Sequence, residues 1–289
     1  MKVGKRLMSS DRTRIALVGL DSSRPTRLLE FLTGPTAPDR SRVRYVVGLE
    51  GDDPEPLAER FAVEATGMKV SDIIGSVDAA LLCTRDGRAH ADQALPLLEA
   101  GISVWVDKPL ATCEDDARSL VRAAATRGLV LACRSGLRDA DAVSAAGQSL
   151  RRTAGTAAFT IAGPADPGSP HGGLAHYGIH HVELCCEVTR RAGRGAPRAV
   201  TGIAVDDGRV RATVQGDRLT AELVFDAPGR CQGFAIMTDG GSWPVEAPPR
   251  YLEQQVLRFV SDVQQDRGTP DPEALVTPVR LLEQLLEHQ

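Results

Sequence analysis

The chain has 289 residues, enough for two domains, and its 42% hydrophobic and 25% charged content is typical of a globular protein. A net charge of −4 offers no basic surface, so nucleic acid is not an expected partner. No apolar run is long enough to span a membrane, and residues 1–13 are predicted to be a flexible tail rather than a signal peptide. The 6 cysteines form no Cys-x-x-Cys pair, which favours free thiols and a cytoplasmic location.

The first half of the chain alternates strand patterns with helix patterns. Apolar strands are predicted at residues 14–19, 44–50, 78–84, 102–106 and 129–133. The helices predicted between them cover residues 25–32, 55–61, 71–74, 90–100 and 113–127. Strands separated by helices of this length indicate a parallel sheet covered on both faces, which we assign to residues 14–134.

The second half has a different pattern, with more strands and fewer helices. Strands are predicted at residues 157–162, 199–205, 209–214, 218–225 and 233–238. Asp207-Gly208 and Gly216-Asp217 are typical of tight hairpin turns, and helices are predicted at residues 174–192, 251–265 and 278–287. Residues 135–289 are therefore expected to form an α+β domain with an open, mostly antiparallel sheet.

The end of one predicted strand carries the strongest functional signal. The buried-looking strand that ends at Val106 is followed at once by Asp107, Lys108 and Pro109. Ligands of α/β proteins lie outside the carboxyl ends of parallel strands, and a partly buried lysine is easily tuned for proton transfer. Proline restricts the backbone just after that lysine. The alternative is a strand that simply ends in a polar turn.

The turn after the first strand stands where a dinucleotide-binding fingerprint would lie, but only its first glycine, Gly19, is present. Asp21 and Arg24 occupy the places of the second and third glycines. Ser22 and Ser23 could still help a helix N-terminus to bind phosphate. A plain strand-to-helix turn explains this pattern almost as well.

Glu50 ends the second predicted strand, where an acid can bind both ribose hydroxyls and repel a 2′-phosphate. The alternative is a solvated loop acid, because Asp52, Asp53 and Glu55 follow.

A histidine-rich segment follows Gly172-Gly173. His176 and His180 are four residues apart, so they share a helix face, and Glu183 lies on a similar face. Three interpretations remain open at this point: a metal site, a proton relay that faces a cofactor, and a structural histidine pair.

The chain resembles the glucose-fructose oxidoreductase, inositol dehydrogenase and MocA (Gfo/Idh/MocA) family. The first matched features are the strand that leads to Gly19 and the acid Glu50. The others are residues 84–90, residues 100–111 with their Asp107-Lys108-Pro109 tripeptide, and the run from Gly172-Gly173 to Gly178-Ile-His180. The resemblance implies a Rossmann domain that binds NAD or NADP, followed by a mostly antiparallel sheet domain that holds the substrate. Between the two cofactors, Glu50 favours NAD. It also implies that Lys108 and His180 are catalytic. Where the family has an aspartate four residues before this histidine, the chain has His176, which is expected to take over that aspartate's orienting role.

The resulting expectation is an NAD(P)-dependent oxidoreductase that acts on a hydroxyl or keto carbon of a sugar-like or cyclitol substrate. The resemblance also implies a homodimer or homotetramer, with no membrane partner. A rival expectation is a catalytically impaired binding or regulatory protein, and a third is a metal-dependent lyase or hydrolase that uses His176, His180 and Glu183, although no metal is expected. The residues expected to bind the cofactor are Gly19, Leu20, Ser22, Ser23, Glu50, Thr84, His90, Asp107 and Lys108.

Overall fold

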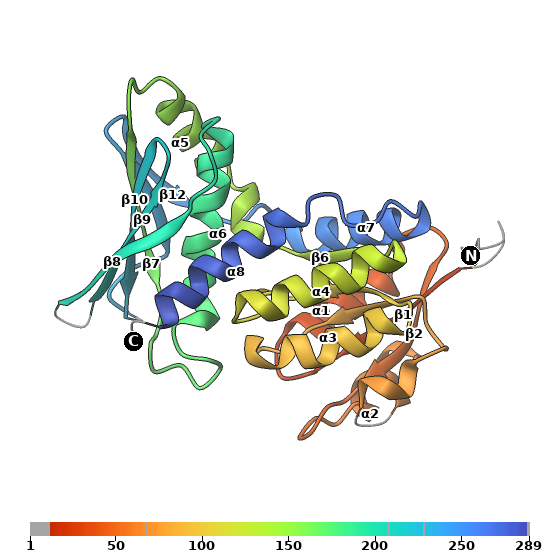
Figure 1. The fold of residues 1–289 in the computed structure, drawn as a ribbon. Helices are drawn as coiled ribbons and strands as arrows, with labels where there is room; N and C mark the ends of the chain where they lie inside the picture. The colour runs from red at the N-terminus through yellow and green to blue at the C-terminus, as the bar shows by residue number, and fades with distance from the viewer. Residues whose placement is uncertain (1–11, 67–68, 207–208, 228, 288–289) are drawn as a thin grey trace.

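The computed structural model contains two six-stranded sheets that lie next to one another (Figure 1). It describes residues 12–287 except 67–68, 207–208 and 228. The tail predicted over residues 1–13 therefore lies almost entirely outside the described residues, as does the turn predicted at Asp207-Gly208.

The first sheet is parallel throughout, with strand order β3-β2-β1-β4-β5-β6. Its strands are β1 (Thr13–Val18), β2 (Ser41–Val47), β3 (Glu64–Thr66), β4 (Ala79–Leu82), β5 (Ser103–Val106) and β6 (Leu131–Cys133). The connecting helices are α1 (Arg24–Leu32), α2 (Glu55–Phe61), α3 (His90–Glu99) and α4 (Glu114–Arg127), with 3-10 turns η1 (Val70–Ile73) and η2 (Gly87–Ala89). The predicted Rossmann topology is confirmed, and only the three-residue edge strand β3 was not predicted.

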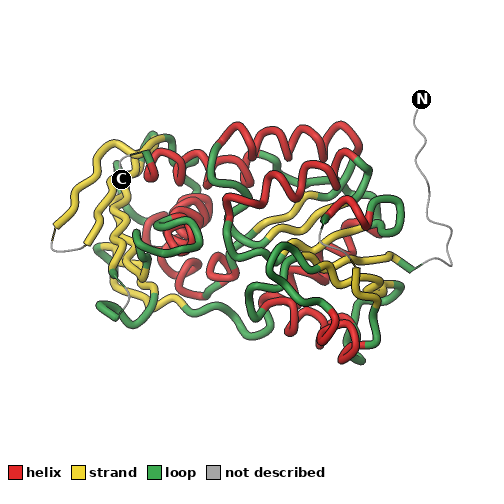
Figure 2. Tube along the Cα trace, turned by 90° about the horizontal axis from the view of Figure 1, so that it is seen from below, coloured by secondary structure: helices red, strands yellow, loops and turns green. Residues whose placement is uncertain are grey.

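Helices cover both faces of this sheet (Figure 2), and apolar side chains fill the space between helices and sheet. Helices α3 and α4 pack on one face. The other face is shared by α1 and, from the far end of the chain, α7 (Tyr251–Gln264). Leu252, Val256 and Phe259 of α7 are buried in the same cluster as Trp105 of β5. The C-terminal half of the chain thus supplies part of the core of the N-terminal sheet.

The second sheet has strand order β12-β11-β7-β10-β9-β8, and all of its pairings are antiparallel except β7 with β10. The strands are β7 (Ala157–Pro164), β8 (Ala199–Asp206), β9 (Arg209–Gly216), β10 (Leu219–Asp226), β11 (Phe234–Thr238) and β12 (Gly241–Val245). The remaining helices are η3 (Gly136–Asp139), α5 (Asp141–Arg151), α6 (Ala175–Arg191) and α8 (Glu273–Leu286). The mostly antiparallel sheet is as predicted, whereas β12 and α5 were not predicted.

The unpredicted elements have weak sequence signals. Strand β12 includes Pro244 and is an edge strand, where proline costs no ladder hydrogen bond. Helix α5 buries small residues, Ala146 and Gly147 among them, so its apolar stripe is faint. Helices α5, α6 and α8 contribute to one apolar core with this sheet (Figure 1). Val205, near the end of β8, pairs with the core residue Val210 but is 70% exposed. Self-association of the chain stays a prediction.

All six cysteines are free thiols. Cys83 and Cys133 are buried, and burial raises the pKa of both thiols. Within the described ranges, no helix combines the length and the apolar character needed to cross a bilayer.

His181 of α6 lies in the core between this helix and the second sheet. Its ring is fully buried, with ring centroids 4.3 Å from Phe225 and 4.9 Å from Phe234. Its Nε2 lies 3.0 Å from the carbonyl oxygen of Val224, and Nδ1 has no partner. Because burial disfavours the charged ring, the pKa of His181 is lowered to about 4.

This burial predicts a loss of stability in acid. Between the ordinary histidine pKa near 6.5 and about 4, the unfolded chain binds a proton that the folded chain does not, so stability falls as pH falls. The contribution of His181 between pH 7 and pH 5 is about 2 kcal/mol. Urea unfolding at both pH values should show a flatter pH dependence for His181→Leu than for the wild-type protein. An equal pH dependence in the two proteins would contradict the assignment.

Candidate active site

The carboxyl end of β5 places an acid and a lysine where two domains meet. Asp107 and Lys108 follow Val106 directly and are 7% and 5% exposed. The Oδ2 atom of Asp107 lies 2.8 Å from Nε of Arg24, the first residue of α1. Lys108 Nζ instead donates a 2.8 Å hydrogen bond to the carbonyl oxygen of His176 in α6. The two side chains therefore connect this strand end to different domains.

Lys108 is buried beside an aromatic ring. Its Nζ lies 5.3 Å from the centre of the Tyr177 ring. Burial lowers the pKa of Lys108, although the neighbouring Asp107 carboxylate opposes that shift. An ammonium group has three donors, and the described residues accept only the one bond to His176. Lys108 can therefore offer further hydrogen bonds to a ligand.

His180 projects from α6 toward the same strand end. Its Nδ1 lies 2.7 Å from Oγ of Ser135, and its ring lies edge-on to Tyr177 and Phe234. Burial, reinforced by the positive charge of Lys108, lowers the pKa of His180 well below its usual value. His180 is therefore neutral at neutral pH, and Nε2 has no partner in the described part of the chain.

Ser135 is the residue that sequence reasoning missed. It lies two residues after β6, and its backbone N–H donates a 2.7 Å bond to Oε2 of Glu183, one turn beyond His180 on α6. Its hydroxyl also accepts the N–H of Leu137 and so caps η3. The signal was available, because Ser135 follows a parallel strand just as Lys108 does.

His176 does not contact His180 through any hydrogen bond of the described residues. Its ring lies 5.3 Å from that of His171 and 5.1 Å from that of Tyr177, and its buried Nδ1 has no partner. Burial lowers the pKa of His176 to about 4. The hydrogen bond at His180 that was expected from His176 is made by Ser135 instead.

His176, His180 and Glu183 were considered as metal ligands, but the described residues do not form such a site. Across residues 12–287, apart from the undescribed gaps, no three His, Cys, Asp or Glu side chains are grouped as metal ligands would be. The Glu183 carboxylate accepts the Ser135 N–H and lies 3.6 Å from Nη1 of Arg138.

Lys108 and His180 face one pocket of about 260 Å³ between the two domains. Its polar lining includes Arg24, Asp107, Arg134, Ser135 and Gln255, and its apolar lining includes Trp105, Tyr177, Phe234 and Tyr251. A pocket of this kind, with a few convergent polar groups on aromatic walls, is typical of a small-molecule site.

In the turn after β1, Gly19 is the only glycine of the dinucleotide-binding fingerprint that is present, and close packing requires it. Gly19 has φ +81°, and a Cβ there would lie 2.5 Å from Oγ1 of Thr84 in the segment after β4. Thr84 is buried behind this turn, where its hydroxyl donates to Gln93. Of the expected cofactor residues, Gly19 and Thr84 therefore shape the turn by packing.

Two carboxylates lie at this turn, and both accept backbone N–H groups. Asp21 accepts the N–H of Arg85 at 3.0 Å, so it is directed at the segment after β4. Asp52 accepts the N–H groups of Leu20 and Leu49. Hydrogen bonds of this type stabilise the carboxylates where they are.

The serines at this turn differ in their bonding. Ser22 donates to the carbonyl oxygen of Cys83 and accepts the N–H of Arg24. Ser23 is the N-cap residue of α1 and makes no capping hydrogen bond, so its hydroxyl remains available.

The remaining expected cofactor residues fall into two groups. Glu50 is exposed beyond the end of β2, as a ribose ligand would be. His90 is fully buried, with its ring nitrogens 2.5 Å from the carbonyl oxygen of Pro109 and 2.9 Å from that of Thr84. We therefore correct the expectation for His90: it holds the segments after β4 and β5 together, and its burial keeps it from a ligand.

The strand ends as a whole fit a dinucleotide. The exposed Glu50 carboxylate suits a ribose, the free Ser23 hydroxyl and the Arg24 guanidinium at the start of α1 suit phosphates, and Lys108 stands at the far end in the pocket.

Comparisons with known proteins agree with this geometry. Residues 13–135 match the family model of the Gfo/Idh/MocA oxidoreductases, described as an oxidoreductase family with an NAD-binding Rossmann fold. Inositol 2-dehydrogenase 3 of Saccharopolyspora erythraea is 44% identical over 59 residues, which is 20% of this chain and 18% of that protein. The matched segment thus spans less than a fifth of that relative.

Solved structures share the fold over nearly the whole chain. GenD2 from gentamicin A biosynthesis, in complex with NAD, has a TM-score of 0.72 at 22% identity and covers 98% of this chain and 96% of its own. The myo-inositol 2-dehydrogenase of Lactobacillus plantarum has a TM-score of 0.74 at 14% identity, with 96% and 98% covered. WlbA dehydrogenase of Thermus thermophilus, in complex with NAD and UDP-GlcNAcA, has a TM-score of 0.72 at 16% identity, with 94% of each chain covered. The Rossmann domain of this chain, at residues 13–135, is therefore similar to the NAD-binding domain of the Gfo/Idh/MocA oxidoreductase family.

Proposed function

We propose that this chain is an NAD-dependent oxidoreductase that interconverts a hydroxyl and a keto group on a polyhydroxylated, sugar-like or cyclitol substrate. The observation that carries the proposal is the pocket of about 260 Å³ into which Lys108 and His180 both face. Relatives named for inositol oxidation, and the WlbA complex with UDP-GlcNAcA, support the substrate class. A pocket with polar groups among aromatic rings suits a hydroxylated ring.

The chain's own residues would hold the dinucleotide along the strand ends. Glu50 would accept the ribose hydroxyls, and Ser23 with Arg24 would bind the pyrophosphate. When bound, NAD supplies the hydride acceptor or donor. Lys108 would stand at the nicotinamide end, at the mouth of the substrate pocket.

Lys108 and His180 would divide the work on the reacting oxygen. Lys108 would donate a hydrogen bond to that oxygen and stabilise negative charge that develops on it. His180, which is neutral, would take the hydroxyl proton on oxidation and return it on reduction. Because a hydroxyl group both donates and accepts, Ser135 could support either tautomer of His180.

A second candidate function is a family member that binds ligand without redox turnover. It is favoured by Asp21 and Asp52, which place two carboxylates beside the turn where pyrophosphate would bind. Titration with NAD, NADH, NADP and NADPH separates the two candidates, because only the first requires a nicotinamide cofactor to bind.

The first prediction of the proposed function is a preference for NAD(H). The exposed carboxylate of Glu50 would repel a 2′-phosphate, so NADH should bind at least about tenfold more tightly than NADPH. Glu50→Gln should reduce this ratio, whereas the neighbouring change Glu55→Gln should leave it alone. Fluorescence titration measures the four dissociation constants. Tighter binding of NADPH by the wild-type protein would reject the role of Glu50.

Lys108→Ala should reduce turnover by roughly 100-fold while NADH affinity and Tm change little, because the lysine acts on the reacting oxygen. A panel of cyclitols, aldoses and sugar acids assayed with NAD must first identify a substrate. Lys69→Ala, which changes an exposed lysine of the first domain, is the matched control. Equal turnover by Lys108→Ala and the wild-type protein would show that the proposed site is wrong.

Ser135→Ala should lower kcat by about tenfold and move the pH at which kcat is half-maximal, because His180 loses the partner of its Nδ1 atom. Ser135→Thr keeps a hydroxyl and should restore the wild-type profile. Ser149→Ala removes a half-buried serine that is also hydrogen-bonded, and it should leave the profile unchanged. If Ser135→Ala lowers Tm but leaves the pH profile of kcat unmoved, Ser135 is only structural.

A further inference from the structure

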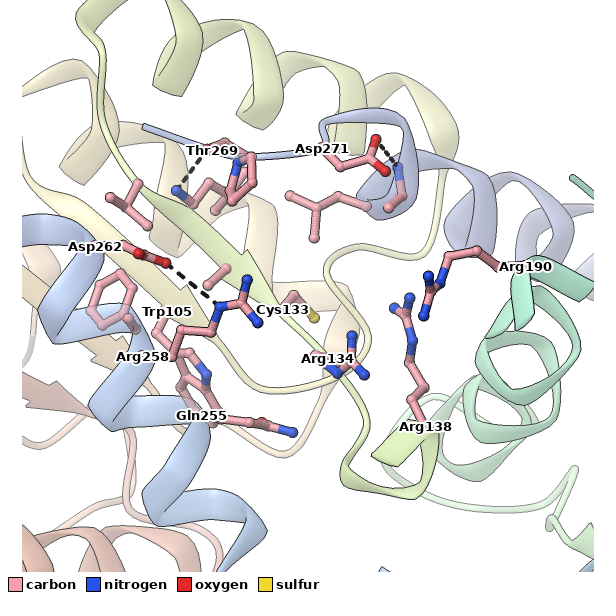
Figure 3. Close-up of a pocket in the computed structure, with 17 residues that line it drawn as sticks. Trp105, Cys133, Arg134, Arg138, Arg190, Gln255, Arg258, Asp262, Thr269 and Asp271 are labelled. Carbon is pink, nitrogen blue, oxygen red and sulfur yellow. Dashed lines mark hydrogen bonds and ion pairs between the residues drawn. The ribbon is translucent and has the colours of Figure 1, made fainter. Parts of the chain in front are cut away.

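A second cavity, of about 420 Å³, lies beside the catalytic pocket and is not used by the proposed function (Figure 3). It is bounded by β6, by α7 and by the segment that leads into α8. Trp105, Arg134 and Gln255 line both this cavity and the catalytic pocket, so they form the partition between the two spaces.

One wall of the cavity is built from arginines that two separate segments bring together. Arg134 follows β6, Arg138 belongs to η3, and Arg190 lies near the end of α6. Figure 3 shows the guanidinium groups of Arg138 and Arg190 next to one another, with that of Arg134 nearby. Such clustering of like charges is unfavourable unless anions offset it.

Two of these arginines, Arg134 and Arg190, form ion pairs within the protein that use only some of their N–H groups. Arg134 uses Nε and Nη2 to bind Asp139. Arg190 uses the same two atoms to bind Glu187. Each guanidinium has five N–H donors, so the Nη1 groups of both arginines lack an acceptor among the described residues.

Arg138 is 7% exposed and also has an unused donor. Its terminal nitrogens lie 3.1 Å from Glu187 and 3.6 Å from Glu183, but its buried Nε has no acceptor. Gln255, which projects from α7, likewise has a buried Nε2 without a partner. A buried donor without an acceptor costs free energy comparable to a lost hydrogen bond.

All of these unused groups are donors, which constrains the chemistry of the missing partner. An acceptor with several oxygens would satisfy them, and guanidinium geometry matches carboxylate and phosphate oxygens. Trp105, Phe259 and Leu275 give the cavity an apolar side. Asp262 and Asp271 also line it, so a ligand with negative charge spread over its whole length would be disfavoured.

We propose that this cavity binds a small molecule with one oxyanionic group, a phosphate ester or a carboxylate, on an apolar or aromatic body. The oxyanion lies against Arg134, Arg138 and Arg190, and the body packs against Trp105 and Phe259. The site does not depend on the proposed redox function, because its arginines stand outside the pocket of Lys108 and His180 except for Arg134.

The test is calorimetric titration of the wild-type chain with phenyl phosphate and with benzoate, which carry the same ring on different oxyanions. We expect saturable binding of at least one of them. Arg190→Ala should weaken it at least fivefold, and this variant should fold, because Arg138 and Arg191 still pair with Glu187. If phenyl phosphate binds more tightly, the natural group is a phosphate ester. If benzoate binds more tightly, it is a carboxylate.

Matched variants locate the bound anion. Arg122→Ala removes an exposed arginine of α4 and should leave the affinity unchanged. Lys108→Ala alters the catalytic pocket and should also leave it unchanged. Tm measured for each variant confirms folding. The proposal is overturned if neither probe binds at millimolar concentration, if Arg190→Ala binds as the wild-type protein does, or if binding is lost only in Lys108→Ala.

Discussion

The geometry of the site depends on the double attachment of Ser135 to α6. The hydroxyl of Ser135 lies 2.7 Å from Nδ1 of His180, and its backbone N–H donates to Glu183 one turn away. These contacts join the end of the first sheet to the helix that packs on the second. Because both are short and largely buried, they fix His180 against the strand end that carries Lys108 more firmly than surface contacts would.

Helix α7 provides the other connection between the halves of the chain. Leu252, Val256 and Phe259 are buried against the first sheet in the cluster that contains Trp105. The same helix lines both the pocket of Lys108 and His180 and the arginine-lined cavity through Gln255. Apolar burial of this size costs several kcal/mol to undo, so both spaces are held by the core rather than by a hinge between independent domains.

The edge that would hold the dinucleotide combines the first glycine of a Rossmann turn with an aspartate in the place of the second. Gly19 remains, because any side chain there would collide with Thr84. Asp21 replaces a glycine, yet its carboxylate accepts the Arg85 N–H and so faces the neighbouring segment. The negative charge of this carboxylate would still repel a pyrophosphate, even though the carboxylate is hydrogen-bonded. This repulsion is the physical reason for considering a protein that binds ligand without redox turnover beside the oxidoreductase.

The sequence by itself determined the parallel sheet, the mostly antiparallel second sheet and the place of Lys108, because periodic burial and strand ends are local properties of a chain. It also indicated His180, but it assigned the orienting role to His176, which stands where the resembling family has an aspartate. Only the tertiary structure brought Ser135 to His180 across 45 residues, packed α7 on the distant first sheet and gathered Arg138 beside Arg190. Such contacts join segments that are far apart in sequence, and no local pattern encodes which polar side chain will meet which.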